Sequence, residues 1–262
     1  MDRFTGPGTP LTRHGFAAAT TALRAAPEAL WAVLSVETSG CGFLPDRRPK
    51  ILFERHFFHR LTRGRFDATN PAISGASPGG YGAGGANQYD RLGEALRLDE
   101  AAALASASWG IGQIMGANHA AAGFANAAAM VVAFTASEDA QLAGMTAFIV
   151  ASKLAPAIEH RRWADFARGY NGPDYAKNRY DERLAAFCRQ FAARGVPDVV
   201  LRAAQVLLTY LGADPGGIDG FAGAKLTAAL RAFQGRTKRA VTGRAGLTTL
   251  AALTAAVDQA QA

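Results

Sequence analysis

The chain has 262 residues, of which 49% are hydrophobic and 19% charged, with a formal net charge of +7. This length and composition exclude a disordered or fibrous chain and predict a folded protein of two domains. The charge favours an anionic partner, such as nucleic acid, a membrane surface or an acidic cell-wall polymer, without selecting among the three.

The start of the chain lacks the apolar segment of a signal peptide, and no stretch is long and apolar enough to predict a membrane span. We therefore expect a chain that is made and kept soluble in the cytoplasm. The two cysteines, Cys41 and Cys188, lie too far apart in the sequence to indicate a disulfide framework. We expect both to be free, buried thiols.

The first predicted helix runs from Leu11 to Ala25 and ends before Pro27, because proline disfavours helical geometry in the preceding residue. A second helix is predicted from Pro27, whose missing N–H is harmless at the first helical position. Gly40 and Gly42 predict its end. One face of this helix carries Leu30, Val33, Leu34 and Glu37. Glu37 thus continues an apolar stripe that faces the core.

Glu37 occupies the last turn of that helix, where unpaired carbonyl groups carry partial negative charge. Both this charge and an apolar surrounding disfavour ionisation, so the pKa of Glu37 is predicted to be raised. A carboxyl that stays protonated near neutral pH is suited to general acid catalysis. The alternative is a frayed helix end from which the carboxyl reaches water.

The middle of the chain alternates apolar runs with glycine-rich segments. A short strand is predicted at 50–53, followed by Glu54, and six glycines predict a mobile loop at 75–87. A helix is predicted at 98–107, running into a buried turn at 108–116. Further helices are predicted at 124–136, 138–153, 158–167 and 175–194. Tyr170 and Asn171 are expected in a tight turn between the last two of these helices.

Gly195-Val196-Pro197 is the predicted domain boundary, which gives domains at 1–194 and 195–262. The second domain contains a short internal repeat: a glycine-rich turn at 220–223 and another at 243–246 each lead into an apolar helix. This segment is small and basic and lacks clustered titratable groups, so binding is favoured over catalysis. As an anchor, it would raise retention on a surface through effective concentration.

Three motifs follow one another along the chain. They are Glu37-Thr38-Ser39-Gly40, Gly110-Ile111-Gly112-Gln113-Ile114 and Gly169-Tyr170-Asn171-Gly172. They resemble the E-S, G-L-M-Q and A-Y-N blocks of the lysozyme-like superfamily. With the local sequences VETSGCGF, ILFERH and SASWGIGQIMG, residues 11–191 are similar to the N-acetylmuramidase domain of phage endolysins. The tail resembles the three-helix peptidoglycan-binding domain, except that FAGA at 221–224 stands where an F-G-P block is usual.

This resemblance implies a mainly α fold, namely an α+β lysozyme-like domain with a small β-sheet, plus a three-helix peptidoglycan-binding domain. It also implies an endolysin that cleaves the β-1,4 bond between N-acetylmuramic acid and N-acetylglucosamine and lyses the host cell. Glu37 would be the general acid. Substrate contacts are implied for Gly110, Gln113, Tyr170 and Asn171. Trp109 is expected to pack beneath the site.

The second carboxylate is open at this stage. An inverting hydrolase needs a base, a retaining one needs a nucleophile, and a lytic transglycosylase needs neither. Glu54 is the first candidate, although a structural ion pair with the neighbouring Arg55 or His56 is an equal reading. Asp90, after the glycine-rich loop, is a weaker candidate. A transglycosylase that forms 1,6-anhydro ends, or a binding protein without activity, are therefore the alternatives.

His56 and His59 have i, i+3 spacing, but the chain contains no HExxH motif and no cysteine pair, so neither a metal nor another cofactor is expected. The basic residues are spread along the chain rather than gathered with aromatic residues, which disfavours nucleic acid. The expected partners are peptidoglycan and an anionic outer-membrane surface. We expect a monomer, held in the host cytoplasm until the membrane is permeabilised and acting afterwards in the periplasm and cell wall.

Overall fold

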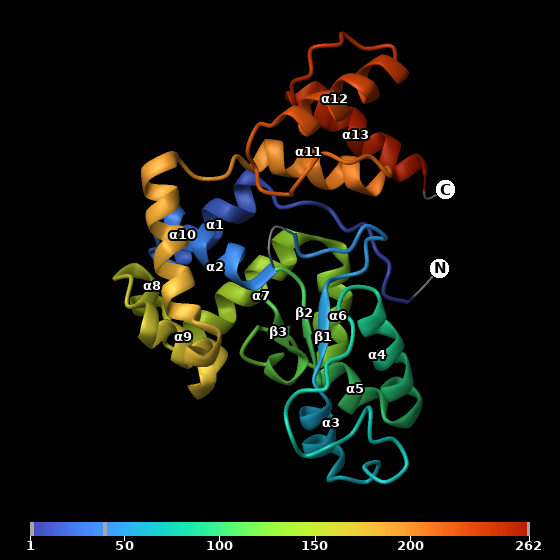
Figure 1. Cartoon of the computed structure of the whole chain (residues 1–262), viewed down its shortest axis with the longest axis vertical. Coiled ribbons are helices and arrows are strands. Elements are labelled where there is room, and N and C mark those ends of the chain that lie inside the picture. Colours follow the sequence, from blue (N-terminus) through green and yellow to red (C-terminus); the bar gives the residue numbers. More distant parts are fainter. Residues whose placement is uncertain (1–2, 39–40, 261–262) are drawn as a thin grey trace.

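A computed structural model describes residues 3–38 and 41–260 of the chain. Figure 1 shows a large, mainly helical part with one small sheet, and a separate group of three helices that lies against it. The predicted fold class is therefore confirmed. Ser39 and Gly40, where the second helix is predicted to end, lie outside the described residues.

Helix α1 (Arg13–Leu23) is capped by Thr12, whose hydroxyl accepts a hydrogen bond from the Gly15 amide. Helix α2 (Pro27–Thr38) begins at Pro27, as predicted, and is buried along most of its length. One side of α2 packs against α10 (Tyr180–Arg194). Because α2 is enclosed in this way, the side chains of its last turn are held in a largely apolar environment.

The sheet contains β1 (Ile51–Phe53), β2 (Ala107–Trp109) and β3 (Ile114–Met115), all antiparallel and in that order. Trp109 pairs with Ile51 on one side and with Ile114 on the other. The strand at 50–53 is confirmed within one residue. The predicted helix over 98–107 is wrong at its end, because residues 107–109 extend to pair with β1.

The remaining elements of the large part form a shell around the sheet and α2. They are α3 (Arg55–Thr62), α4 (Asn87–Leu98), α5 (Glu100–Ala105), a 3-10 turn (Gly116–Asn118), α6 (Ala127–Ala136), α7 (Glu138–Ala151), α8 (Ala155–Glu159), α9 (Trp163–Asn171) and a 3-10 turn (Pro173–Asn178). The predicted helix over 158–167 is wrong, since two helices meet there at Arg161, which has a positive φ of 55°. Tyr170 and Asn171 consequently lie in the last turn of α9 and not in a loop.

The C-terminal part consists of α11 (Val199–Tyr210), α12 (Ala224–Arg236) and α13 (Leu247–Gln259). The two glycine-rich turns that repeat in the sequence make the same kind of hydrogen bond. The Gln205 side chain accepts a hydrogen bond from the Gly220 amide at 2.8 Å, and the Gln234 side chain accepts one from the Gly243 amide at 2.8 Å. Both glycines have a positive φ, which a turn of this shape requires.

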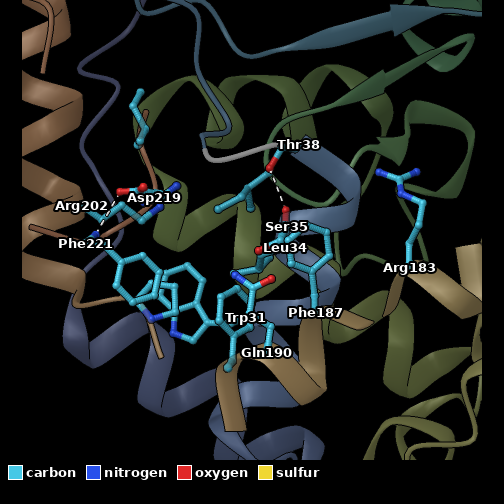
Figure 2. Close-up of a pocket in the computed structure, with 14 residues that line it drawn as sticks. Trp31, Leu34, Ser35, Thr38, Arg183, Phe187, Gln190, Arg202, Asp219 and Phe221 are labelled. Carbon is cyan, nitrogen blue, oxygen red and sulfur yellow. Dashed lines mark hydrogen bonds between the residues drawn. The ribbon is translucent and has the colours of Figure 1, made fainter. Parts of the chain in front are cut away.

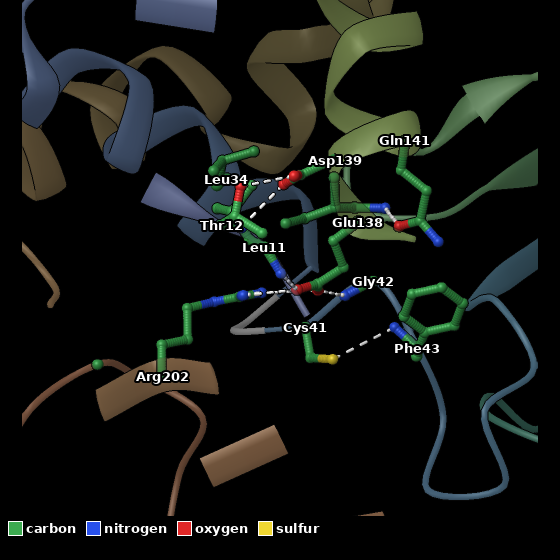
Figure 3. A network of polar contacts seen from close by, with 12 residues as sticks. Leu11, Thr12, Leu34, Cys41, Gly42, Phe43, Glu138, Asp139, Gln141 and Arg202 are labelled. Atoms are coloured by element: carbon green, nitrogen blue, oxygen red, sulfur yellow. Dashed lines mark hydrogen bonds and ion pairs between the residues drawn. The ribbon is translucent and has the colours of Figure 1, made fainter. Parts of the chain in front are cut away.

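A buried ion pair joins the two parts (Figure 3). Arg202 of α11 and Glu138 of α7 are 1% and 0% exposed, with Nη1–Oε2 and Nη2–Oε1 distances of 2.6 and 2.7 Å. The same carboxylate accepts hydrogen bonds from the backbone amides of Leu11 and Gly42 at 2.8 and 2.7 Å. Glu138 therefore connects the N-terminal segment, the loop that follows α2, and the C-terminal helices.

Apolar contacts extend this interface. Val206 of α11 packs with Cys41 and Phe43, which follow α2, and the Tyr210 hydroxyl donates to the Gly8 carbonyl at 2.9 Å. Cys41 and Cys188 are both buried and free, as predicted. The C-terminal helices are thus packed directly on the large part, rather than tethered to it as an independent anchor. Within the described residues, no helix has the length and apolar character needed to cross a bilayer.

Removing one partner of the buried ion pair should destabilise the whole chain. We expect Arg202→Met to lower the free energy of unfolding by about 3–5 kcal/mol, because the Glu138 carboxylate is left buried without its counter-charge. Adding Glu138→Gln should recover part of this loss, since a neutral amide still accepts a hydrogen bond. Chemical denaturation of the full-length chain measures both effects.

The matched control is Arg239→Met, which removes an exposed arginine of the same C-terminal part. It should leave the unfolding free energy within about 0.5 kcal/mol of the starting protein. Equal stabilities for the Arg202 and Arg239 variants would show that the buried pair does not hold the two parts together.

Candidate functional site

Glu37 lies in the last turn of α2 and is half-buried. Burial raises the pKa of Glu37 to about 7, against the opposing effects of a hydrogen bond from Asn171 and the positive charge of Arg183. The Asn171 Nδ2 atom donates to Glu37 Oε1 at 3.2 Å. The sequence predicted this direction of the shift. Near neutral pH, about half of this carboxyl population is protonated.

Glu37 opens into a pocket of about 240 Å³. Its lining comes from Glu37, Thr38, Leu44, Lys50, Ile51, Gly85 and Gln113. Glu37 is the one carboxylate among these described residues. Lys50 contributes a positive charge, and its Nζ atom donates to the Thr38 carbonyl at 3.1 Å. The pocket therefore brings together the end of α2, the first strand, the β2–β3 turn and the glycine-rich segment.

The glycine-rich segment is fixed to the sheet by Gln88, which is 1% exposed. Gln88 Oε1 accepts a hydrogen bond from the Phe53 amide at 3.0 Å, and Nε2 donates to the carbonyls of Tyr81 and Ala83 at 2.7 and 2.8 Å. Gly85 has a φ of 68° and open space where a Cβ would stand. The segment predicted as mobile thus has a defined course beside the pocket.

The last turn of α9 forms the opposite side of Glu37. The Tyr170 hydroxyl donates to the Gly112 carbonyl at 2.6 Å, and its ring stacks on Phe166 at a centroid distance of 5.1 Å. Burial raises the pKa of Tyr170 well above its usual value, and the nearby Glu37 charge adds to this effect. Asn171 Oδ1 is buried and has no hydrogen-bond partner among the described residues.

Gly110 and Gln113 support the wall of the site through their own hydrogen bonds. Gln113 Nε2 donates to the carbonyls of Lys50 and Gly110 at 3.2 and 2.8 Å, and its Oε1 accepts from Ser108 at 2.9 Å. A Cβ on Gly110, whose φ is 69°, would stand 2.5 Å from Cδ of Gln141. Gln113 lines the pocket, whereas Gly110 shapes the turn behind it. Substrate contacts from these two residues stay a prediction.

Glu54 precedes α3 directly and is 16% exposed. Burial raises its pKa, and a hydrogen bond with Tyr81 opposes that rise. Glu54 Oε2 lies 3.2 Å from His56 Nδ1, yet neither atom has a hydrogen-bond partner in the described part of the chain. The structure does not place Glu54 in the lining of the Glu37 pocket. Asp90 is exposed on the first turn of α4.

Tyr180 and Tyr81 were not predicted as site residues, but their ionisation is affected by Glu37 and Glu54. Burial raises the pKa of Tyr180, and the charges of Glu37 and Tyr81 act in the same direction. Burial likewise raises the pKa of Tyr81, with the Glu54 charge adding to it. Tyr180 is thus affected by the charges of Glu37 and Tyr81, and Tyr81 by the charge of Glu54. No motif identified Tyr180, because it lies on a helix that the sequence predicted only from its apolar face.

The two histidines with metal-like spacing have separate surroundings. His59 Nδ1 lies 2.7 Å from Asp67 Oδ2, while His56 lies beside Glu54. Across residues 3–38 and 41–260, no three His, Cys, Asp or Glu side chains are grouped to hold a metal ion.

Glu37 lies at the end of a buried helix, in a pocket that a short antiparallel sheet also lines. Comparison with known families identifies the class of protein. Residues 26–192 match the model of the N-acetylmuramidase family, and residues 200–253 match that of a peptidoglycan binding domain. The chain belongs to the N-acetylmuramidase family, and it is a glycoside hydrolase that acts on peptidoglycan.

Among solved structures, the chain is similar to the crystal structure of the Burkholderia AP3 phage endolysin. The two are 39% identical with a TM-score of 0.63, over 70% of this chain and 71% of that one. No curated protein matches. The family and domain resemblances drawn from the sequence motifs are confirmed.

Ionisation of Glu37 should reduce stability as the pH rises. A carboxyl with a folded pKa of about 7 and a reference value of 4.5 binds its proton more tightly in the folded chain. Stability from this group is therefore present below pH 4.5 and lost as the pH rises through 7. Glu37→Gln removes the titration, so its stability relative to the unsubstituted chain should increase by about 3 kcal/mol between pH 4 and pH 8.

Denaturation curves over this pH range check the effect. Glu28→Gln, in the first turn of the same helix, is the control, since Glu28 pairs at the surface with Arg161. Parallel pH profiles for the unsubstituted chain and the Glu37 variant would mean that Glu37 titrates as an ordinary carboxyl.

Proposed function

We propose that this protein is a phage endolysin that cleaves the β-1,4 bond between N-acetylmuramic acid and N-acetylglucosamine, with Glu37 as the general acid. The observation that carries the proposal is a buried carboxyl with a pKa of about 7 that opens into a pocket. The family match and the similarity to a phage endolysin support it.

In this mechanism, protonated Glu37 donates its proton to the glycosidic oxygen as the bond to the anomeric carbon breaks. Positive charge then develops on the sugar ring, next to the newly formed carboxylate. Asn171 holds the Glu37 carboxyl, because its amide N–H donates a hydrogen bond to Glu37 Oε1. The rate should fall as the pH rises through about 7, where Glu37 loses its proton.

Glu54 is proposed as the base that activates water in an inverting reaction. Its buried Oε2 has no hydrogen-bond partner among the described residues, and Tyr81 orients the other side of the carboxyl. An inverting pair requires room for water between the acid and the base.

One observation favours a second candidate, a lytic transglycosylase. Glu37 is the one carboxylate among the described residues that line its pocket. A transglycosylase needs no second carboxylate, because the muramic acid 6-hydroxyl attacks the anomeric carbon and closes a 1,6-anhydro ring. Glu37 would act first as the acid and then as the base for that hydroxyl.

The cellular role follows from the same proposal. The chain is held in the host cytoplasm until the membrane is permeabilised, and afterwards reaches peptidoglycan in the periplasm and cell wall. Its net charge of +7 suits an anionic outer-membrane surface, and we propose that it acts there as a monomer.

Glu37→Gln should lower the rate of peptidoglycan solubilisation by about 100-fold or more, because a neutral amide supplies no proton to the leaving oxygen. The rate is measured as turbidity loss of purified peptidoglycan at pH 6. Glu28→Gln on the same helix should retain the starting rate. A Glu37 variant that lyses at the full rate would refute the assignment.

Mass spectrometry of the soluble fragments separates the two reactions. Hydrolysis gives muramic acid ends that borohydride reduces, and Glu54→Gln should then lower the rate by about 100-fold. Fragments that are one water lighter and resist reduction, with an unaffected Glu54 variant, would establish the transglycosylase instead.

A further inference from the structure

A second pocket, of about 330 Å³, lies between the large part and the C-terminal helices (Figure 2). Its lining comes from α2, α10, α11 and the segment at 218–221. Thr38 lines both this pocket and the pocket of Glu37. The two pockets are therefore neighbours at the end of α2, and the second one exists only because the two parts are docked.

One wall of the second pocket is a row of aromatic rings. Phe187 and Phe191 of α10 stack with centroids 5.9 Å apart, and Phe191 stacks on Phe221 at 6.4 Å, with interplanar angles of 25° and 22°. Phe191 is buried, while Phe187 and Phe221 are half-buried. The row crosses from the large part to the C-terminal part and presents an apolar surface to whatever enters the pocket.

Charged groups lie at opposite ends of this wall. Asp219 is exposed, and its Oδ1 atom is fixed by hydrogen bonds from Gln205 Nε2 at 2.9 Å and from the Phe221 amide at 3.0 Å. Arg183 is exposed at the other end, close enough to Glu37 to act on its ionisation. Figure 2 shows Asp219 and Arg183 on opposite sides of the aromatic residues. Arg202 also lines the pocket, but Glu138 neutralises its charge.

This pattern of charge selects between the two components of peptidoglycan. The N-acetyl sugars of the glycan strand are neutral, whereas the peptide stems carry carboxylates and the ammonium group of a diamino acid. A stem begins on the lactyl group of the muramic acid unit. Because Thr38 lines both pockets, a muramic acid unit bound at Glu37 can direct its stem past Thr38 into the second pocket, which Arg183 also lines.

We propose that the pocket between the two parts binds the peptide stem of peptidoglycan, with a stem carboxylate at Arg183 and the diamino acid ammonium at Asp219. Side-chain methylenes of the stem then pack on the row formed by Phe187, Phe191 and Phe221. The identity of this ligand depends on the proposed function, which places muramic acid at Glu37. The C-terminal part, on this view, completes the substrate site in addition to holding the wall.

The test uses the full-length protein and a soluble stem tripeptide, alanyl-γ-glutamyl-diaminopimelate, measured by titration calorimetry. Asp219→Asn removes the negative charge while its side-chain oxygen still accepts the two existing hydrogen bonds. Asp214→Asn is the matched control, because Asp214 is an exposed aspartate of the same part that pairs with Lys225 outside the pocket. We expect Asp219→Asn to weaken tripeptide binding by about ten-fold and Asp214→Asn to leave it unchanged.

A second measurement compares cleavage of peptidoglycan with cleavage of glycan strands from which an amidase has removed the stems. Asp219→Asn should raise KM several-fold for the stem-bearing substrate and leave KM for the bare strands unchanged. Failure of the unsubstituted protein to bind the tripeptide would overturn the proposal. Equal effects of Asp219→Asn on both substrates, or binding of a chitin oligosaccharide that depends on Asp219, would assign the pocket to glycan and also overturn it.

The two proposals fail in different ways. Absence of glycan cleavage by the unsubstituted protein, together with tripeptide binding that depends on Asp219, would refute the proposed reaction and support the pocket. Glycan cleavage that requires Glu37, without tripeptide binding, would do the reverse.

Discussion

The buried ion pair between Glu138 and Arg202 is the interaction on which the arrangement of the molecule depends. Burial raises the pKa of Glu138, but the Arg202 guanidinium and the backbone amides of Gly42 and Leu11 outweigh it, so the pKa lies below its usual value. The ionised carboxylate thus holds the chain that leaves α2, immediately beyond Glu37. Gln141, one turn further along α7, accepts the Ile111 amide at 2.7 Å and fixes the β2–β3 turn from the same side.

Glu37 is the contrasting glutamate. Within residues 3–38 and 41–260, its carboxyl accepts a hydrogen bond from the neutral Asn171 and has Arg183 as a nearby charge. Burial of the carboxyl outweighs both effects, so its pKa rises to about 7. The pKa of Glu138 is therefore lowered, whereas that of Glu37 is raised. The difference lies in whether a guanidinium is in direct contact with the carboxyl.

Local patterns in the sequence predicted much of this fold and part of the site. Pro27 marked the start of α2, and the apolar face of that helix revealed the burial of Glu37. The partner of Glu138 could not be found in this way, because Arg202 lies 64 residues further along the chain in the other part. The need for glycine at position 110 could not be predicted either. A Cβ there would collide with Gln141, which is distant in the sequence. The split of the helix predicted at 158–167 depends on one residue with positive φ, Arg161.

To act as the general acid, Glu37 must still hold its proton near neutral pH. The most direct measurement is a carbon NMR titration of the protein labelled at the glutamate side-chain carboxyl, with the Glu37 signal identified by its loss in Glu37→Gln. We predict a midpoint near pH 7 for that signal, because burial at the end of α2 raises the pKa of the carboxyl. A midpoint near the ordinary value of 4.5 would contradict it, because the carboxyl would then be ionised and unable to protonate a leaving oxygen at neutral pH.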